Sequence, residues 1–384
     1  MNWFTDFSTN NAKAIIGVSF VVLLVAGMGI AKLRFSHDML SWLPGKMPVR
    51  QATQIIDKKL KGSVTLELIL DTGKENGLYE PQVLNNIDRF ARELEHDTEL
   101  TVDVGKVMAV TDILKEIHQA LNENRADFYA IPQNRKLIPQ EFLLFENSGS
   151  DDLEDVIDSR FQLARITVKV PWQDAMYYVP FIEEIETRAG QIFGSDMKIT
   201  TTGVMALFGR IIYASIYSAV TSYIIAAAVI TLLMIFLLGN IRLGLISMIP
   251  NLMPIIITIG AMGWLNISLN MFTMLIGSIA IGIAVDDTIH FVYNFRRYFS
   301  QSGDPVEAIR NTLQTAGQAM LTTTIVLSIG FFIFMFASMQ NFFYFGLLTG
   351  TALILALASD FLLAPALMTL TAGSVSGKSA LMRR

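Results

Sequence analysis

Six apolar segments of this 384-residue chain are long enough to cross the hydrocarbon core of a membrane, which takes about 20 residues. They lie at roughly residues 14–30, 223–238, 243–264, 271–292, 320–337 and 342–370. A bilayer offers no water to the backbone, so segments of this kind must be helices. The sequence therefore predicts a polytopic α-helical membrane protein with six transmembrane helices. The composition agrees, since 52% of the residues are hydrophobic and only 16% are charged.

The first apolar segment has some features of a secretory signal peptide. Its leading region carries one lysine, Lys13, offset by Asp6, and its apolar run is longer than the usual 7–15 residues. We expect it to be retained as a membrane span. The opening residues, MNWFTDFSTNNAK, are expected to be a native start.

Most of the charge lies between the first and second spans. Residues 31–216 contain 21 Lys/Arg and 28 Asp/Glu, which gives this segment a net charge of −7. This pattern predicts a soluble domain inserted between two spans. The expected boundaries are 1–33 for the N-terminus and first span, 34–216 for the inserted domain, 217–372 for the five-span bundle and 373–384 for a tail.

The inserted domain shows two sets of β-α-β elements. The first set has strands at residues 62–72 and 100–110 around a helix at 81–95. The second has strands at 161–170 and 197–204 around a helix at about 175–193, and helical segments separate the two sets. Paired units of this kind predict an α+β domain of two ferredoxin-like subdomains.

The positive residues near the spans indicate the orientation of the chain. With the N-terminus inside, the cytoplasmic segments carry eight of them: Lys13, Arg242, Arg296, Arg297, Arg310, Lys378, Arg383 and Arg384. The two short outer loops, WLNISLN and SMQN, carry none. We therefore expect both termini in the cytoplasm. The acidic domain would then lie in the periplasm of a two-membrane bacterium, with the spans in the inner membrane.

Two adjacent aspartates, Asp286 and Asp287, interrupt the fourth span, MFTMLIGSIAIGIAVDDTIHF. A carboxylate at bilayer depth costs about 2.5–3.5 kcal/mol on insertion scales, and two neighbouring like charges cost more. Folding does not require this cost. The sequence therefore predicts a functional site at which protons or cations are held within the membrane.

Three further polar residues are candidates for a proton relay with this pair. His290 lies one turn further on the same helix face, where it either exchanges protons with the pair or sits at the interface beside Arg296 and Arg297. Asp360 in the sixth span is either a structural tie to a neighbouring helix or part of a proton exit. Thr323 belongs to a run of three threonines that samples the helix circumference, so one hydroxyl can face the pair. Otherwise these hydroxyls bond back to their own helix.

Several functional classes find no support in the sequence. The chain has no cysteine, its four histidines form no HxH or HExxH pattern, and there is no Walker A or GxSxG motif. Neither a metal nor another cofactor is indicated, and an enzyme is the least favoured class. The calculated pI of about 5.5 and the lack of a basic cluster argue against a nucleic-acid partner. Energy for any pumping would come from an ion gradient or a partner protein.

The layout of one span, a large outer domain and five further spans resembles one half of a resistance-nodulation-division (RND) transporter. Residues 282–297, GIAVDDTIHFVYNFRR, are similar to the GxxxDD motif of the MMPL-type and Patched/Dispatched branches. The five later spans resemble the sterol-sensing-domain arrangement. Residues 62–81 resemble the domain that opens each half of bacterial hydrophobe exporters. The resemblance implies that Asp286 and Asp287 are proton-coupling groups.

Members of this superfamily usually carry two such halves, whereas this chain has one. The simplest completion is a homodimer. The alternatives are a separately encoded second half, or a degenerate half that only senses lipid. The partner lysine found in some relatives' second half is not in this fourth span.

The sequence as a whole predicts proton-driven export of hydrophobic or amphiphilic, lipid-like molecules. A substrate groove is expected beside Phe208, Tyr217 and Trp264. Membrane lipids and periplasmic or outer-membrane proteins are the expected partners. One alternative is a lipid-binding sensor that does not pump, and a second is an accessory factor for protein secretion.

Overall fold

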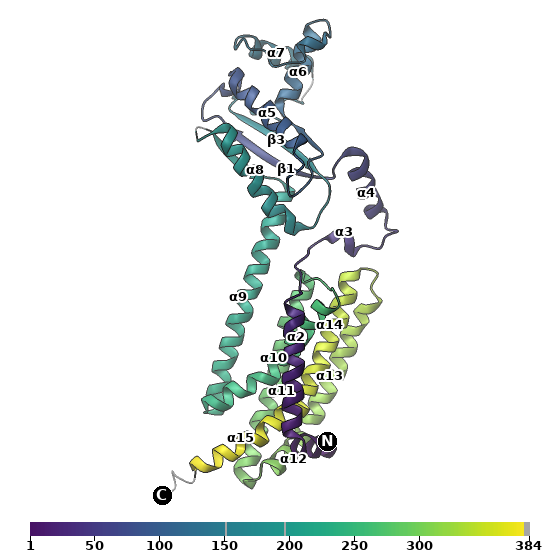
Figure 1. Cartoon of the computed structure of the whole chain (residues 1–384), viewed down its shortest axis with the longest axis vertical. Helices are drawn as coiled ribbons and strands as arrows, with labels where there is room; N and C mark the ends of the chain where they lie inside the picture. The colour runs from purple at the N-terminus through teal and green to yellow at the C-terminus, as the bar shows by residue number, and fades with distance from the viewer. Residues whose placement is uncertain (150–151, 196, 380–384) are drawn as a thin grey trace. The chain divides into compact units, whose positions relative to one another are not determined.

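The computed structural model describes residues 1–149, 152–195 and 197–379 (Figure 1). The chain divides into two compact units. The first, here called the membrane unit, contains residues 1–37, 42–44 and those from 215 onward. The second, called the outer unit, contains residues 38–41 and 45–214. Arg383 and Arg384, two of the basic residues expected on the cytoplasmic side, lie outside the described residues, as does Asp151 in the inserted domain.

Six helical segments of the described chain are long and apolar enough to span a membrane. They are Ala12–Ile30, Val204–Leu238, Ile241–Trp264, Met271–Ser302, Gly317–Phe336 and Gln340–Thr371. By length and composition, this confirms the predicted class of polytopic helical membrane protein. The first four are helices α2, α9, α10 and α11; the fifth joins α13 (Gly317–Phe332) to the 3₁₀ turn η4 (Ile333–Phe336). The sixth contains α14 (Gln340–Ala358), the π-helical turn η5 (Ser359–Leu363) and the start of α15 (Ala364–Ser379).

Glycines bring α2 and α10 into close contact. A Cβ atom at Gly260 would lie 2.6 Å from the Cα atom of Ala26, and Gly29 and Gly263 are similarly crowded. Small residues of this kind let membrane helices pack backbone to backbone. The indole N–H of Trp264 adds a hydrogen bond of 2.9 Å to the Val25 carbonyl.

The fourth span, α11, has well-defined ends. The Asn270 side chain accepts hydrogen bonds from the N–H groups of Phe272 and Thr273, and the Thr273 hydroxyl accepts one from the Asn270 N–H. This reciprocal pair is a capping box. The helix ends at Gly303, whose positive φ of 70° suits glycine. Within the membrane unit, α11 packs against α10, α12 and α14.

Two short helices accompany the spans. α12 (Pro305–Thr315) follows the fourth span, and the Asp304 side chain caps its start by accepting from the Val306 N–H. α1 (Asn2–Asn10) was not predicted. An ion pair of 2.8 Å between Arg310 and Asp6 links α12 to α1.

The outer unit contains one four-stranded antiparallel sheet. Its strands are β1 (Val64–Asp71), β2 (Lys106–Met108), β3 (Leu163–Val170) and β4 (Lys198–Thr202). Their order is β2-β3-β1-β4, with Val64 opposite Val170 and Leu70 opposite Ile199. Both β-α-β sets are present, but they share a single sheet. The prediction of two separate subdomains is therefore corrected, because the central strands β1 and β3 pair with each other.

Helices cover one face of this sheet. Leu66, Leu68 and Leu70 alternate along β1 and are almost fully buried. α5 (Pro81–His96) and α8 (Tyr178–Phe193) pack against each other, and Phe90 and Tyr178 supply the largest side chains of their buried faces. The remaining helices of this region are α3 (Met39–Trp42), α4 (Pro48–Leu60), α6 (Val110–Leu121), α7 (Leu137–Glu146) and the short turns η1 (Gly77–Tyr79), η2 (Ala126–Phe128) and η3 (Ala175–Tyr177).

The strand predicted at residues 100–110 is much shorter than expected. Only Lys106–Met108 pair with β3, at its Thr167–Lys169 segment. Leu100 and Val102 are buried, yet they lie outside the ladder. Their alternating pattern reflects contact with the core and not strand pairing.

Candidate functional site

The two aspartates of the fourth span lie in different surroundings. Consecutive residues of an α-helix point about 100° apart. Asp287 is only 6% exposed, whereas the Asp286 side chain is 75% exposed. The described chain therefore covers only one of the two carboxyl groups.

His290 shares the exposed face of α11 with Asp286, as the spacing predicted. Its Nε2 atom lies 3.8 Å from the Asp286 carboxylate, and its side chain is 64% exposed. Arg296, one of the two arginines beside which His290 was alternatively placed, donates to the Leu237 carbonyl at 3.2 Å. His290 therefore contacts the Asp286 side of the pair.

A buried polar network joins three helical elements of the membrane unit. The Thr288 hydroxyl on α11 lies 2.7 Å from Asn251 Oδ1 on α10 and 2.7 Å from Asp360 Oδ1 on η5. The amide nitrogen of Asn251 donates to the Ser247 carbonyl at 3.2 Å. These four residues are at most 1% exposed. Sequence reasoning found Asp360 but missed Thr288 and Asn251, although Thr288 directly follows the pair and Asn251 stands between two prolines of its span.

Thr323 takes part in a different set of hydrogen bonds. Its hydroxyl is placed to donate to the carbonyl oxygens of Ala319 and Met320, each 3.0 Å away in its own helix. α13 packs mainly on α14 and α12. In this conformation the Thr323 hydroxyl bonds back to its helix and is not directed to the aspartates.

The three residues expected to form a substrate groove lie on two helices, Phe208 and Tyr217 on α9 and Trp264 on α10. Tyr217 is 73% exposed on α9, and Trp264 is tied to α2 by its indole hydrogen bond. The Nζ atom of Lys32 also lies 3.8 Å from the centre of the Trp264 ring. Phe208 belongs to the first turns of α9 in the outer unit.

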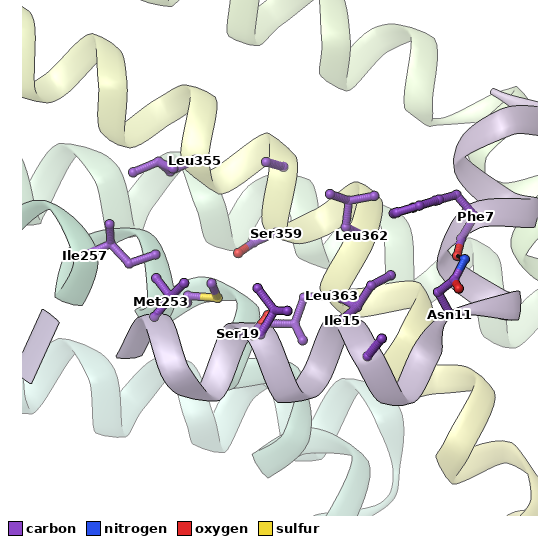
Figure 2. Close-up of a pocket in the computed structure, with 14 residues that line it drawn as sticks. Phe7, Asn11, Ile15, Ser19, Met253, Ile257, Leu355, Ser359, Leu362 and Leu363 are labelled. Carbon is purple, nitrogen blue, oxygen red and sulfur yellow. Dashed lines mark hydrogen bonds between the residues drawn. The ribbon is translucent and has the colours of Figure 1, made fainter. Parts of the chain in front are cut away.

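An apolar cavity of about 400 Å³ lies elsewhere in the membrane unit, between α2, α10 and the C-terminal span. Figure 2 shows Ile15 and Ser19 on α2 facing Ser359 and Leu362. Phe208, Tyr217 and Trp264 do not line it. Its walls are mainly aliphatic, with a few hydroxyl and amide groups, as is usual for sites that bind apolar ligands.

Metal binding gains no support from the arrangement. In residues 1–149, 152–195 and 197–379, no group of three or more histidine, aspartate and glutamate side chains is placed to hold a metal ion.

The described chain combines six candidate membrane spans, the buried carboxyl groups of Asp287 and Asp360, and a compact α+β unit. These features define a polytopic helical membrane protein. The sequence profile of the AcrB/AcrD/AcrF family matches residues 182–376, slightly more than half of the chain. The chain belongs to this family, and so to the RND superfamily.

Individual relatives agree with this assignment. Membrane protein MJ1562 of Methanocaldococcus jannaschii is 20% identical over 338 residues, which cover 85% of this chain and 82% of the relative. The toluene efflux pump membrane transporter TtgB and the antibiotic efflux pump membrane transporter ArpB of Pseudomonas putida are each 30% identical over 131 residues. That match covers 33% of this chain but only 12% of either pump.

Proposed function

We propose that this chain is a half transporter that uses the proton gradient to export hydrophobic or amphiphilic, lipid-like molecules. The observation that carries the proposal is the burial of Asp287 in the middle of an apolar span. An ionisable group at such a position is costly, and proton transfer gives it a role. Relatives whose names describe efflux pumps support export as the direction.

The proposed mechanism couples the charge of Asp287 to the packing of α11. With the carboxyl group protonated, α11 rests against α10 and α14 without a buried charge. Loss of the proton places a charge at that contact and favours a shift of α11. α9 runs as one helix from Val204 to Leu238, and its 35 residues exceed the roughly 20 needed for a span. A helix of this length can carry movement beyond the membrane core.

The exposed pair of Asp286 and His290 supports a two-half assembly. A carboxyl group and an imidazole that face lipid in mid-span would be strongly unfavourable. A second half packed on this face would cover both side chains. We propose that the second half is another copy of this chain, with a separately encoded half as the alternative.

The proposed location is the inner membrane of a two-membrane bacterium, with both chain termini in the cytoplasm and the outer unit in the periplasm. Periplasmic or outer-membrane proteins are proposed partners there. The basic residues at Lys13, Arg242, Arg296 and Arg297 support this orientation.

The apolar cavity between α2, α10 and the C-terminal span is the proposed site for an alkyl chain. Phe208, Tyr217 and Trp264 do not line this cavity, and they stay a separate proposed substrate groove. Ser19 and Ser359 offer hydroxyl groups in otherwise apolar walls.

The test is transport by the purified chain in proteoliposomes, with NBD-labelled phosphatidylethanolamine as the probe. We expect the probe to move between leaflets several-fold faster with an imposed pH gradient than without one. Binding of the probe with no effect of the gradient would instead favour a lipid sensor. Co-purification with a protein-secretion channel, without movement of the probe, would favour a secretion accessory factor.

A further inference from the structure

The hydroxyl group of Thr288 has two oxygen neighbours but only one hydrogen to donate. Both Asn251 Oδ1 and Asp360 Oδ1 lie 2.7 Å from Thr288 Oγ1. An amide oxygen and an ionised carboxylate oxygen are both pure acceptors. If Asp360 were ionised, one of the two short contacts would therefore hold no hydrogen.

The orientation of Asn251 decides where the Thr288 hydrogen goes. The Nδ2 group of Asn251 donates to the Ser247 carbonyl at 3.2 Å. Turning the amide over would place Oδ1 against that carbonyl, with two acceptors in contact. Asn251 therefore presents Oδ1 to Thr288, and the Thr288 hydroxyl donates to it.

Asp360 must then supply the hydrogen of the remaining contact. A protonated Asp360 donates to Thr288, Thr288 donates to Asn251, and Asn251 donates to the Ser247 carbonyl. This gives three hydrogen bonds in one direction. The second carboxyl oxygen of Asp360, Oδ2, is buried with no hydrogen-bond partner in the described part of the chain. A full negative charge in that position would be poorly stabilised.

The charged groups on the neighbouring elements do not change this conclusion. η5 packs against α1, α2, α10, α11 and α14, and it continues into α15, whose charged residue Lys378 lies near the end of that helix. From α11, Asp287 is a second buried carboxyl group. Asp6 pairs with Arg310, and Lys13 and Arg242 lie in the first turns of their helices. The remaining charged residues are exposed on α11: Asp286, His290, Arg296 and Arg297.

We propose that Asp360 is a further proton-binding carboxyl group, whose proton determines whether Thr288 ties α11 to α10. With the proton on Asp360, Thr288 donates to Asn251 and α11 is tied to α10. When the proton leaves, Thr288 turns its hydrogen to the Asp360 carboxylate, and Asn251 loses its donor. This inference rests on the proposed function only for the use of the proton, not for its location.

Local backbone geometry favours such a change. Asp360 lies in the five-residue π-helical turn Ser359–Leu363, and turns of this kind often occur at functional sites. Pro365 follows at once, and without an N–H it cannot donate to the Phe361 carbonyl. On the other side, Pro250 and Pro254 flank Asn251 and weaken the hydrogen-bond ladder of α10.

The test is infrared difference spectroscopy of the purified full chain in nanodiscs, in the C=O stretching region of protonated carboxyl groups. The wild type should show a buried-acid band at neutral pH that Asp360→Asn removes. Thr288→Val should shift this band to higher frequency, because the acid loses its acceptor. The matched control is Thr349→Val, since Thr349 is fully buried but its hydroxyl has no hydrogen-bond partner among the described residues.

Two results would overturn the inference: no such band at neutral pH, or the same band in wild type and Asp360→Asn. If Asp360→Asn does not fold, the shift caused by Thr288→Val decides instead, and an unshifted band contradicts the inference. The proposed function is separable from it. Loss of gradient-driven transport in Asp287→Asn, with no band from Asp360, would remove this inference alone. If Asp360 gives the band but transport is independent of the pH gradient, the inference is supported and the proposed function is contradicted.

Discussion

Asp286 and Asp287 are neighbours in sequence, but their carboxyl groups lie on different sides of α11. Asp287 is 6% exposed, while the Asp286 side chain is 75% exposed and lies 3.8 Å from His290. The two groups therefore have separate tasks in the proposed mechanism. Asp287 gains or loses a proton where α11 is packed in the membrane unit. Asp286 lies on the exposed face of α11, which the proposed second half would cover.

The exposed face of α11 should lie at the interface between two copies of the chain. The chain has no cysteine, so a single introduced cysteine gives an unambiguous crosslink. Gly282 lies one turn before Asp286, and a Cβ there meets nothing within 4 Å. We expect Gly282→Cys to form a disulfide-linked dimer in oxidised membranes, measured by non-reducing electrophoresis.

The matched control for this crosslink is Val21→Cys on α2. Val21 is 57% exposed but belongs to another helix. Equal crosslinking of the two variants would indicate random collision, and no dimer from Gly282→Cys would argue against a homodimer through α11.

Thr323→Val should leave gradient-driven transport within about two-fold of wild type. The Thr323 hydroxyl bonds to carbonyl groups of its own helix, so its removal disturbs no contact between helices. The measurement is the proteoliposome assay at matched protein density. A ten-fold loss would show that Thr323 reaches the aspartates in another state of the transport cycle.

Gly260→Ala should weaken the contact between α2 and α10. The added methyl group would lie 2.6 Å from the Ala26 Cα atom, and overpacking of this kind costs about 1–3 kcal/mol. We expect a lower apparent melting temperature in detergent, followed by light scattering. Gly27→Ala is the control, because a Cβ at that position meets nothing within 4 Å. Equal loss in both variants would contradict the close packing of Gly260.

The stability of the outer unit should fall in acid partly because of Asp158. Burial by itself raises the pKa of Asp158, but hydrogen bonds from the backbone N–H groups of Leu163, Gln162 and Arg160 lower it below its usual value. A lowered pKa in the folded state means that the carboxylate stabilises the fold at pH values above about 3.9, its unfolded pKa. This stability is lost as the pH falls through the lower folded value.

The measurement for Asp158 is thermal unfolding followed by tryptophan fluorescence, in which Trp172 reports on the outer unit. Asp158→Asn should cost about 1 kcal/mol at pH 7 and reduce the loss of stability between pH 4 and pH 2. An unchanged acid transition in the variant would show that other carboxyl groups dominate it.

The sequence predicted features that depend on local signals. The apolar runs predicted all six spans. The burial of Asp287 and the exposure of Asp286 could not be predicted, because they depend on which helices pack around α11. The network of Thr288, Asn251 and Asp360 was missed for the same reason, since its members are 37 and 72 residues apart in sequence.

The most direct test of the central claim compares Asp287→Asn with wild type in the gradient-driven proteoliposome assay, with NBD-labelled phosphatidylethanolamine as the probe. Asparagine keeps the size of the side chain but cannot bind or release a proton. We predict that the variant folds and binds the probe, and that its gradient-dependent transport rate is at least ten-fold lower than that of the wild type. Transport by Asp287→Asn at the wild-type rate, with the same dependence on the gradient, would contradict the account.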